Sequence, residues 1–423
     1  MLHQWQKVTP VAALLAANLI SQIGNFITFL AVPWFVLETT GSASRAGITV
    51  AVGGLPVIIA GIFGGAIVDR LGYKRTSICA DLASGVTVIC IPLLHQTVGI
   101  AFWQLLALVF LGALMDVPGI TARRSLFPEL IEQTGMGLER ANAFYAIVNR
   151  TAGILGPALA GVLIAILGPS HVLWIDGATF AVSAAIVAAL IPAGLVSASE
   201  TIDRGLARYV REIREGFQFL WRDPVLISLA IVIAIGGLLA EPLYGVILPV
   251  YAREVFGSAV DLGFIFAALA AGSIVGNVLY MVMSPRLSRR LILITGISVR
   301  ALTFWVLLTL PPFWVVAASI FINAMFFEPL NPLVMTIFQE RVPAGMRGRV
   351  FGVNSALGSS TLPVGLLAYG LLLDGIGLQD TLIVLAILNL TMPIAAVTLP
   401  SLRDMSRPQP ASARSPAVQT AID

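Results

Sequence analysis

The sequence predicts an all-α integral membrane protein whose twelve transmembrane helices form two pseudo-symmetric six-helix bundles. Of its 423 residues, 58% are hydrophobic and 11% are charged, whereas about a quarter of the residues of ordinary soluble domains are charged. The mean hydropathy is +0.93, and apolar runs of about twenty residues recur along the chain without the alternation typical of a β-barrel. A soluble enzyme that carries a single membrane anchor is therefore excluded.

Each predicted span is an apolar run long enough to cross about 30 Å of hydrocarbon. We place the spans at residues 11–37, 45–68, 76–95, 99–121, 141–167, 171–192, 225–250, 260–283, 290–310, 313–338, 349–373 and 380–400. Stretches rich in glycine and proline are expected to break or kink their helices. The first run is too long for a signal-peptide core, and we expect it to be retained.

An even number of spans places both termini on the same side of the membrane. All but four of the 25 Lys and Arg residues fall on that side, because Arg45 and Arg253 lie in opposite loops and Arg150 and Arg300 lie within spans. By the positive-inside rule that side is the cytoplasm. We therefore expect a multi-pass protein of the plasma (cytoplasmic) membrane.

The longest internal loop divides the spans into two sets of six. We expect an N-terminal bundle at 1–192, a cytoplasmic linker at 193–224, a C-terminal bundle at 225–402 and a disordered tail at 403–423. Apolar residues recur at helical spacing in the linker: Leu206, Val210, Ile213, Phe217 and Leu220. This pattern predicts an amphipathic helix that lies along the inner membrane face or docks a partner. Repeated halves are typical of transporters in which two bundles rock about a central site.

The segment from Gly64 to Arg75 carries a glycine, an Asp-Arg pair, a second glycine and two basic residues. It resembles the loop signature of the major facilitator superfamily. The residues of this gating loop and its expected partners are Gly65, Asp69, Arg70, Gly72, Lys74, Arg75, Arg347 and Arg349. The resemblance implies that Asp69 latches the cytoplasmic side against the start of span eleven. The alternative is a basic loop that only sets the topology.

A second motif lies in span five. Its residues Gly153, Gly156, Pro157 and Gly161 resemble the signature of exporting, antiporter members of the superfamily, although close helix packing explains them equally well. With the phrase from Leu173 to Phe180, the whole chain resembles the macrolide-efflux and siderophore-exporter branch. Lysophospholipid transporters share much of this pattern.

Charged residues within the hydrocarbon are costly and are candidates for function. The chain has five that we single out: Asp116, Arg150, Glu241, Arg300 and Glu328. We expect Glu241 and Glu328 to handle protons or substrate, and Asp116 to pair with Arg150 on a neighbouring helix. Structural pairing of acids with buried arginines is the alternative.

Polar residues also recur on one face of span one, at Asn18, Ser21, Gln22 and Asn25. Because their spacing is helical, they share a face, which we expect to point into the central cavity. Hydrogen bonding between helices is the alternative.

The function predicted is a secondary active exporter of small lipophilic or amphiphilic molecules, either drug-like or siderophore-like. We expect it to be driven by counter-transport of protons, surrounded by lipid and monomeric, with no cofactor, no metal site and no nucleic-acid partner. Lysophospholipid transport and uptake of small solutes remain alternatives. A membrane receptor or an intramembrane enzyme would need an external domain or a converging set of reactive groups, and the sequence offers neither.

Overall fold

The computed structural model describes residues 2–192, 206–284, 286–343, 346–403 and 405. Within these ranges it leaves out the side chains of residues 2–7, 57–70, 138–140, 143, 206–210, 212–213, 348 and 359. The described chain is helical throughout, apart from short turns between the helices.

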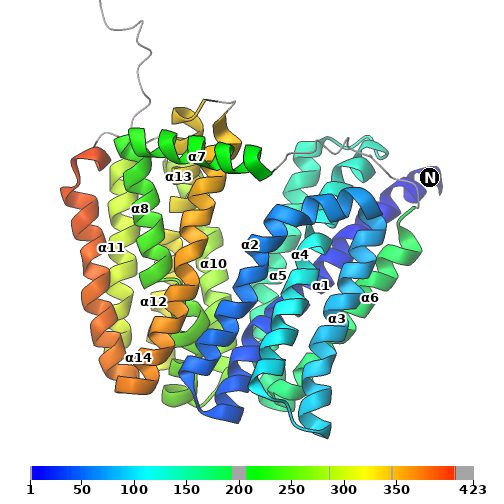
Figure 1. The fold of residues 1–423 in the computed structure, drawn as a ribbon, viewed down its shortest axis with the longest axis horizontal. Helices are drawn as coiled ribbons and strands as arrows, with labels where there is room; N and C mark the ends of the chain where they lie inside the picture. Colours follow the sequence, from blue (N-terminus) through cyan, green and yellow to red (C-terminus); the bar gives the residue numbers. More distant parts are fainter. Residues whose placement is uncertain (1, 193–205, 285, 344–345, 404, 406–423) are drawn as a thin grey trace, which may run out of the picture.

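The first half consists of six long helices. They are α1 (Leu2–Thr40), α2 (Ala43–Leu71), α3 (Tyr73–Thr97), α4 (Phe102–Glu132), α5 (Leu138–Leu167) and α6 (Pro169–Leu190). Helix α1 packs mainly on α5 and α6, and α3 packs on α4 and α6. These six helices form one bundle (Figure 1).

A separate helix, α7 (Leu206–Arg222), precedes the second half and lies within the predicted linker, residues 193–224. The second half contains α8 (Pro224–Leu239), η1 (Leu243–Ile247), α9 (Leu248–Tyr251), η2 (Ala252–Phe256), α10 (Ala259–Met283), α11 (Arg289–Leu308), α12 (Phe313–Phe327), α13 (Leu330–Arg341), α14 (Arg347–Thr398) and the short 3₁₀ turn η4 (Pro400–Leu402). Asp223 caps the start of α8, because its carboxylate accepts from the backbone N–H groups of Val225 and Leu226 at 2.9 and 3.2 Å.

The predicted number of spans is confirmed. Ten stretches of the described chain are long and apolar enough to cross a membrane, and one of them, Arg349–Thr398, contains the last two predicted spans. The chain reverses direction within α14 at Gly377, whose φ of 79° is one that a side chain disfavours. Helix α2, where many side chains are not described, supplies the remaining span. The largest boundary error is in span four, because α4 continues from the predicted end at residue 121 to Glu132.

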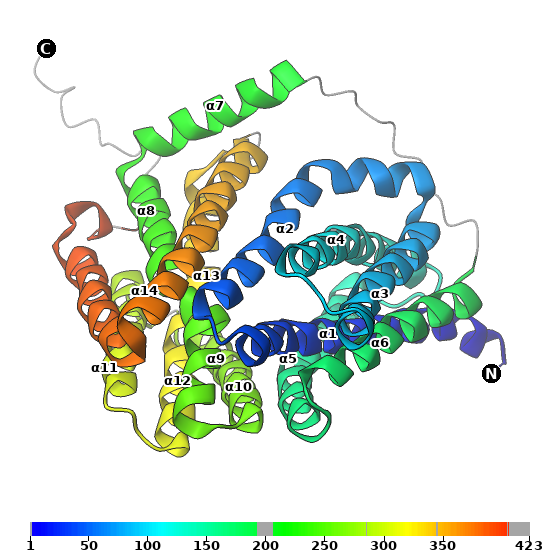
Figure 2. The same cartoon turned by 60° about the horizontal axis from the view of Figure 1, so that its bottom comes forward.

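The two bundles lie side by side (Figures 1 and 2). Helix α7 and the start of α1 are at one end of the molecule, which we call the linker face; the turn between α1 and α2 is at the other end, the far face. Between the halves, α2 contacts α14 and α5 contacts α10.

The closest approaches between the halves lie toward the far face. A β-carbon at Gly47 of α2 would be 2.5 Å from the carbonyl oxygen of Leu366 in α14. One at Gly161 of α5 would be 2.5 Å from the carbonyl oxygen of Ala259 at the start of α10. Only glycine permits backbones to approach so closely, so the far face is held together by interlocking helices.

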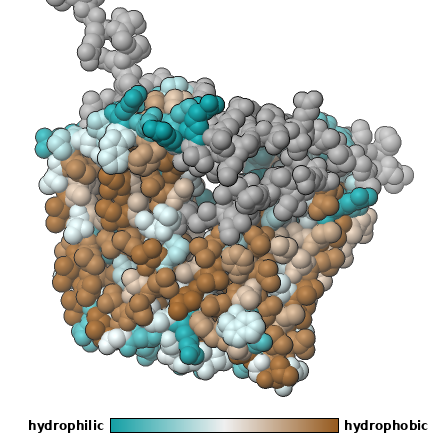
Figure 3. Space-filling model, viewed as in Figure 1, coloured by the Kyte–Doolittle hydropathy of each residue, from teal (hydrophilic) through white to brown (hydrophobic). Residues whose placement is uncertain are grey.

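The surface has the pattern of a membrane protein. Figure 3 shows a broad band of apolar residues across the face in view, with hydrophilic residues over α7 at the top and along the lower rim. On α7, Leu220 is fully buried against the second half, whereas Phe217 and Trp221 stack on each other and are exposed. Of the predicted apolar face, Leu220 packs on the second half and Phe217 stays exposed, so the position of this helix along the membrane face stays a prediction. The side chains of Leu206, Val210 and Ile213 lie outside the described residues.

Candidate functional site

The second half encloses a cavity of about 560 Å³. Its walls come from α8, α11, α12, α13 and α14, and are mostly aliphatic and aromatic. The polar residues on its wall are Glu241, Arg300, Glu328, Asn331, Asn354, Ser355 and Asn389. An apolar hollow with a few polar groups is the usual form of a site for a small molecule.

Two broken spans bring the acids to this cavity. Span seven stops being α-helical after Leu239 and resumes as the π-helical turn η1, with Glu241 and Pro242 at the break. Span ten breaks between α12 and α13, at Glu328 and Pro329. Proline lacks a backbone N–H and interrupts the helical hydrogen bonds, so each acid lies where its helix is discontinuous. Such breaks and π-helical turns often mark binding sites in transporters.

Arg300 is the positive group of the cavity. Its guanidinium Nη2 donates to Glu241 Oε1 at 3.1 Å, and its Cζ lies 3.9 Å from the centre of the Phe327 ring. The Arg300 side chain is 5% exposed, whereas that of Glu241 is 44% exposed. The arginine is thus anchored within the bundle by the ring and the carboxylate, and the acid remains accessible from the cavity.

Glu328 is the second acid. It is half-buried, and Asn331 Nδ2 donates to its Oε2 at 3.5 Å. Glu241 and Arg300 both lie within electrostatic range of Glu328, and so does Arg150 of the first half. The sequence-predicted residues Glu241, Arg300 and Glu328 are therefore brought together.

Arg150 does not form the pair with Asp116 that the sequence predicts. Its Nη1 donates to Ser273 Oγ of α10 at 3.2 Å, across the boundary between the halves. Asp116 instead accepts a hydrogen bond from Asn25 Nδ2 at 3.0 Å. The predicted pair of Asp116 with Arg150 is wrong because α5 turns this face toward α10 rather than toward α4.

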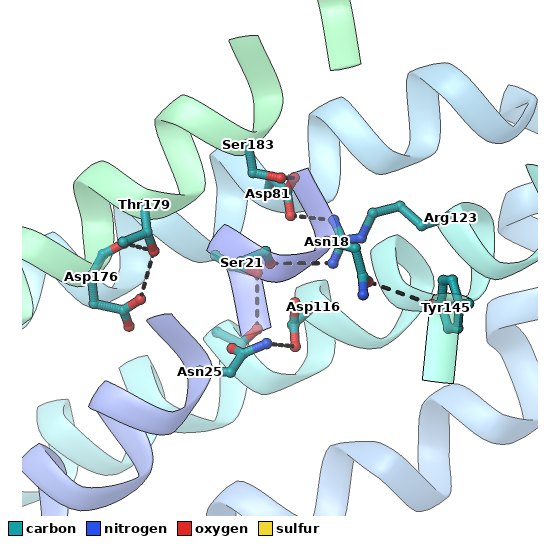
Figure 4. Close-up of polar contacts among 12 residues, drawn as sticks. Asn18, Ser21, Asn25, Asp81, Asp116, Arg123, Tyr145, Asp176, Thr179 and Ser183 are labelled. Atoms are coloured by element: carbon teal, nitrogen blue, oxygen red, sulfur yellow. Dashed lines mark hydrogen bonds and ion pairs between the residues drawn. The ribbon is translucent and has the colours of Figure 1, made fainter. Parts of the chain in front are cut away.

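A buried ion pair that the sequence analysis missed lies in the first half (Figure 4). Arg123 Nη1 of α4 and Asp81 Oδ1 of α3 are 2.7 Å apart, and both side chains are completely buried. Ser183 donates to the other carboxylate oxygen at 2.7 Å, and Arg123 Nη2 donates to Ser21 at 3.2 Å. Because the predicted span four ended at residue 121, Arg123 was counted as a loop residue. The apolar positions Leu126 and Phe127, three and four residues later, carry the signal that the helix continues.

Asp116 and Asp176 line a separate cavity of about 330 Å³ in the first half. Asp176 is fully buried and accepts hydrogen bonds from Thr28 and Thr179. Asp176 belongs to the phrase from Leu173 to Phe180, and its place in a cavity could not be predicted from that phrase. Asp116 has one oxygen, Oδ1, that is buried and has no hydrogen-bond partner among the described residues.

The polar face of span one points into the first bundle. Asn18 and Ser21 are fully buried; Asn18 donates to Asn149 at 2.9 Å, and Tyr145 lies 3.5 Å from Asn18. The expected orientation toward a central cavity is wrong for these two residues, because their partners are other helices of the same half. Asn25 does line the first-half cavity, and Gln22 is half-buried.

In the gating loop, the side chains of Gly65, Asp69 and Arg70 lie outside the described residues. Gly72 has a φ of 77° and starts α3, so a glycine is needed there. Lys74 Nζ donates to the carbonyls of Ala188 and Ile191 at the end of α6, at 2.8 and 2.5 Å. Arg75 is exposed.

The expected partners of this loop bind elsewhere. Arg347 donates to the carbonyls of Gln339 and Val342. Arg349 Nη1 lies 2.5 Å from Glu215 Oε2 of α7. Both arginines therefore contact the second half or the linker helix, and the latch with Asp69 stays a prediction.

The span-five motif packs tightly. A β-carbon at Gly156 would be 2.7 Å from Phe26 Cβ of α1. Gly161 and Pro157 pack on the start of α10, where a β-carbon at Gly263 would be 2.5 Å from the Pro157 carbonyl oxygen. Gly153 is looser, since its nearest neighbour would be Phe26 Cζ at 3.8 Å. These contacts support the packing interpretation of the motif.

Comparison with known proteins agrees with this architecture. The solved structure of the nucleoside transporter NupG superposes with a TM-score of 0.74 at 12% identity, covering 92% of this chain and 98% of that chain. A bacterial homologue of the iron transporter ferroportin, in an inward-facing state, gives a TM-score of 0.70 at 16% identity, covering 93% and 98%. At such identities the similarity establishes the fold alone.

Sequence relatives are closer. The multidrug efflux pump Tap of Mycolicibacterium fortuitum is 34% identical over 404 residues, covering 94% of this chain and 98% of that protein. Macrolide efflux protein A of Streptococcus pyogenes is 22% identical over 397 residues, covering 92% and 96%. The family model of the Major Facilitator Superfamily matches residues 14–259 and 238–421. The chain therefore belongs to the major facilitator superfamily of membrane transporters.

Proposed function

We propose that this protein exports small lipophilic or amphiphilic cations from the cytoplasm in exchange for protons, by alternating access. In this proposal it works as a monomer in the plasma membrane, its two bundles are the predicted units 1–192 and 225–402, and its termini and linker face are cytoplasmic. The relatives named for multidrug and macrolide efflux support export of drug-like molecules. The excess of Lys and Arg on the linker face supports the orientation.

The observation that carries the proposal is the cavity of the second half. Its wall is largely apolar but holds two carboxyl groups, Glu241 and Glu328, against one guanidinium, that of Arg300. When both acids are ionised, the groups on the cavity wall carry one more negative than positive charge, since Arg150 lies outside the lining, and this charge attracts an amphiphilic cation. Aromatic and aliphatic walls bind the apolar part of the same molecule.

Protons and substrate compete for this charge. Glu241 is already paired with Arg300, so Glu328 is the acid better placed to bind a substrate cation. Protonation of Glu328 removes the negative charge and releases the cation. Because Glu328 can bind either a proton or the substrate cation but not both, the two are exchanged for each other.

Unpartnered polar atoms support substrate binding here. Arg300 Nε and Asn354 Oδ1 are buried without a hydrogen-bond partner among the described residues, and both side chains line the cavity. A buried polar atom without a partner is costly. A polar group on the substrate can satisfy it.

The first half supplies a second place for a proton. Asp116, held by Asn25 beside Asp176, has a buried unpartnered oxygen at the smaller cavity. We assign the gating-loop residues Asp69 and Arg349 to closure of the cytoplasmic side. Arg150, which reaches α10, links the two halves near their centre.

The test is transport into everted membrane vesicles, using fluorescent amphiphilic cations and an imposed pH gradient. Wild-type protein should accumulate the cation when the vesicle interior is acidic, and collapse of the gradient should release it. Glu328→Gln should lower accumulation at least tenfold. Glu254→Gln, which alters an exposed acid outside the cavity, is the matched control and should transport normally.

A panel of substrates sharpens the result. Neutral macrolide-like compounds, anionic siderophores and lysophospholipids are compared with the cations in the same vesicles. Preference for lysophospholipids would replace the proposed substrate class. Accumulation that ignores the gradient and survives Glu328→Gln together with Glu241→Gln would overturn proton exchange at this cavity.

A further inference from the structure

A carboxylate joins the two halves at the far face. Asp374, near the end of the first span of α14, accepts hydrogen bonds from three groups at the start of α2. Its Oδ1 accepts from the Ala43 backbone N–H at 2.7 Å. Its Oδ2 accepts from Ser42 Oγ at 2.7 Å and from the Ser44 backbone N–H at 3.0 Å. One side chain of the second half thus binds the end of a helix in the first.

These bonds complete the N-terminus of α2. A helix leaves its first N–H groups without partners inside the helix. Ser42 Oγ accepts from the Arg45 N–H at 3.2 Å, and the Ser42 carbonyl accepts from Ala46. Asp374 accepts from the backbone N–H groups of Ala43 and Ser44, which Ser42 does not bind. Its negative charge also lies at the positive end of the helix dipole.

The surrounding backbone holds the carboxylate in place. A β-carbon at Gly370, one turn before Asp374, would lie 2.8 Å from Ser44 Cα. Helices α14 and α2 therefore touch directly at this point. Separation of the halves at the far face has to break all three hydrogen bonds of Asp374 together.

We propose that Asp374 is the outer latch of the transport cycle. It caps α2 while the far face is closed, and its hydrogen bonds to α2 break when that face opens. It is a positioning residue and does not touch the substrate. The arrangement mirrors the latch predicted on the linker face between Asp69 and the start of span eleven. The inference rests on the alternating access proposed above, but it needs neither the substrate nor the coupling ion.

The expected effect is moderate because Asp374 is exposed. Water can replace each hydrogen bond when the halves separate. An exposed carboxylate at a helix N-terminus changes an equilibrium by about 2- to 5-fold. Loss of Asp374 should shift the ratio of outward-open to outward-closed molecules by that factor.

The experiment measures distances between spin labels by pulsed electron paramagnetic resonance on purified protein in nanodiscs. The labels are attached in a variant in which Cys79 and Cys90 are replaced. One pair, on the exposed residues Val98 and Trp314, reports the far face. The other, on the exposed Gln133 and Gln339, reports the linker face. Wild type, Asp374→Ala, Asp374→Asn and the control Asp380→Asn, an exposed acid just beyond the chain reversal at Gly377, are compared at the same pH. Wild type is also measured at a second pH and with a transported cation.

Asp374→Ala should lengthen the far-face distance, shorten the linker-face distance and lower the transport rate severalfold, and Asp374→Asn should do so less. Asp380→Asn should match wild type. If Asp374→Ala does not fold, Asp374→Asn, which has the same shape, decides the matter. Distances equal to wild type in a folded Asp374 variant would overturn the latch. A wild type whose distances never change with pH or substrate would instead refute alternating access.

Discussion

The two halves of the molecule hold charge within the membrane in different ways. In the first half, Asp81 and Arg123 are completely buried on unbroken helices, and serines bind Asp81 Oδ2 and Arg123 Nη2. In the second half, Glu241 and Glu328 lie at breaks in their helices and border a cavity. Arg300 is buried there, but its partner Glu241 is 44% exposed.

The comparison separates structural charge from functional charge. A completely buried ion pair that faces no cavity is placed to serve the fold, because removal of one partner leaves the other charge buried and uncompensated. An acid that faces a cavity can bind and release. We therefore expect substitutions in the first pair to damage stability, and substitutions in the second site to damage transport.

The largest effect is expected for Arg123→Leu. This change leaves the Asp81 carboxylate buried without its counter-charge, which costs about 3–5 kcal/mol. Thermal unfolding of purified protein in detergent measures the loss. The double variant Asp81→Leu with Arg123→Leu should recover a large part of it, because the uncompensated charge is gone. A single variant as stable as wild type would remove the contrast between the halves.

Much of the fold could be predicted from the sequence. The lengths of the apolar runs predict the spans, and the breaks at Glu241 and Glu328 lie beside prolines, in line with the general expectation that stretches rich in glycine and proline break helices. The pair of Asp81 with Arg123 was not found, because it depends on where span four ends and on which faces of α3 and α4 meet. The orientation of Asn18 failed for a similar reason: spacing shows that polar residues share a face, but not what that face packs against.

The second largest effect is expected for Gly161→Ala. The new β-carbon would be 2.5 Å from the Ala259 carbonyl oxygen, which belongs to the backbone and cannot move alone. Overpacking of this kind costs about 1–3 kcal/mol, and it should loosen the far face. Gly153→Ala is the matched control in the same helix, since its β-carbon would have an ordinary contact at 3.8 Å. Equal melting temperatures for the two variants would show that the interface between the halves is looser than the contacts indicate.

A smaller change of stability is expected for Glu241→Gln. Glutamine keeps an oxygen that can accept from the Arg300 guanidinium at the place of Glu241 Oε1, and the contact of the guanidinium with the Phe327 ring is retained. The loss is then the difference between a charged and a neutral acceptor, about 1 kcal/mol. Transport of a cation in vesicles should nevertheless fall at least tenfold. The contrary result would be a Glu241→Gln protein that is destabilised as much as Arg123→Leu and whose transport falls only as far as the amount of folded protein falls. Glu241 would then serve the fold rather than transport.

The smallest effect is expected for Glu215→Gln on the linker helix. Glu215 and Arg349 are 39% and 34% exposed, so water already solvates both, and such pairs contribute about 0–1 kcal/mol. The melting temperature should change by no more than a degree or two, and less still in high salt, where exposed charges are screened. Together with Arg123→Leu, this variant compares two ion pairs of similar length, 2.5 and 2.7 Å, that differ mainly in burial. If Glu215→Gln proves as damaging as Arg123→Leu, burial is not what sets the cost of losing a charge partner in this protein.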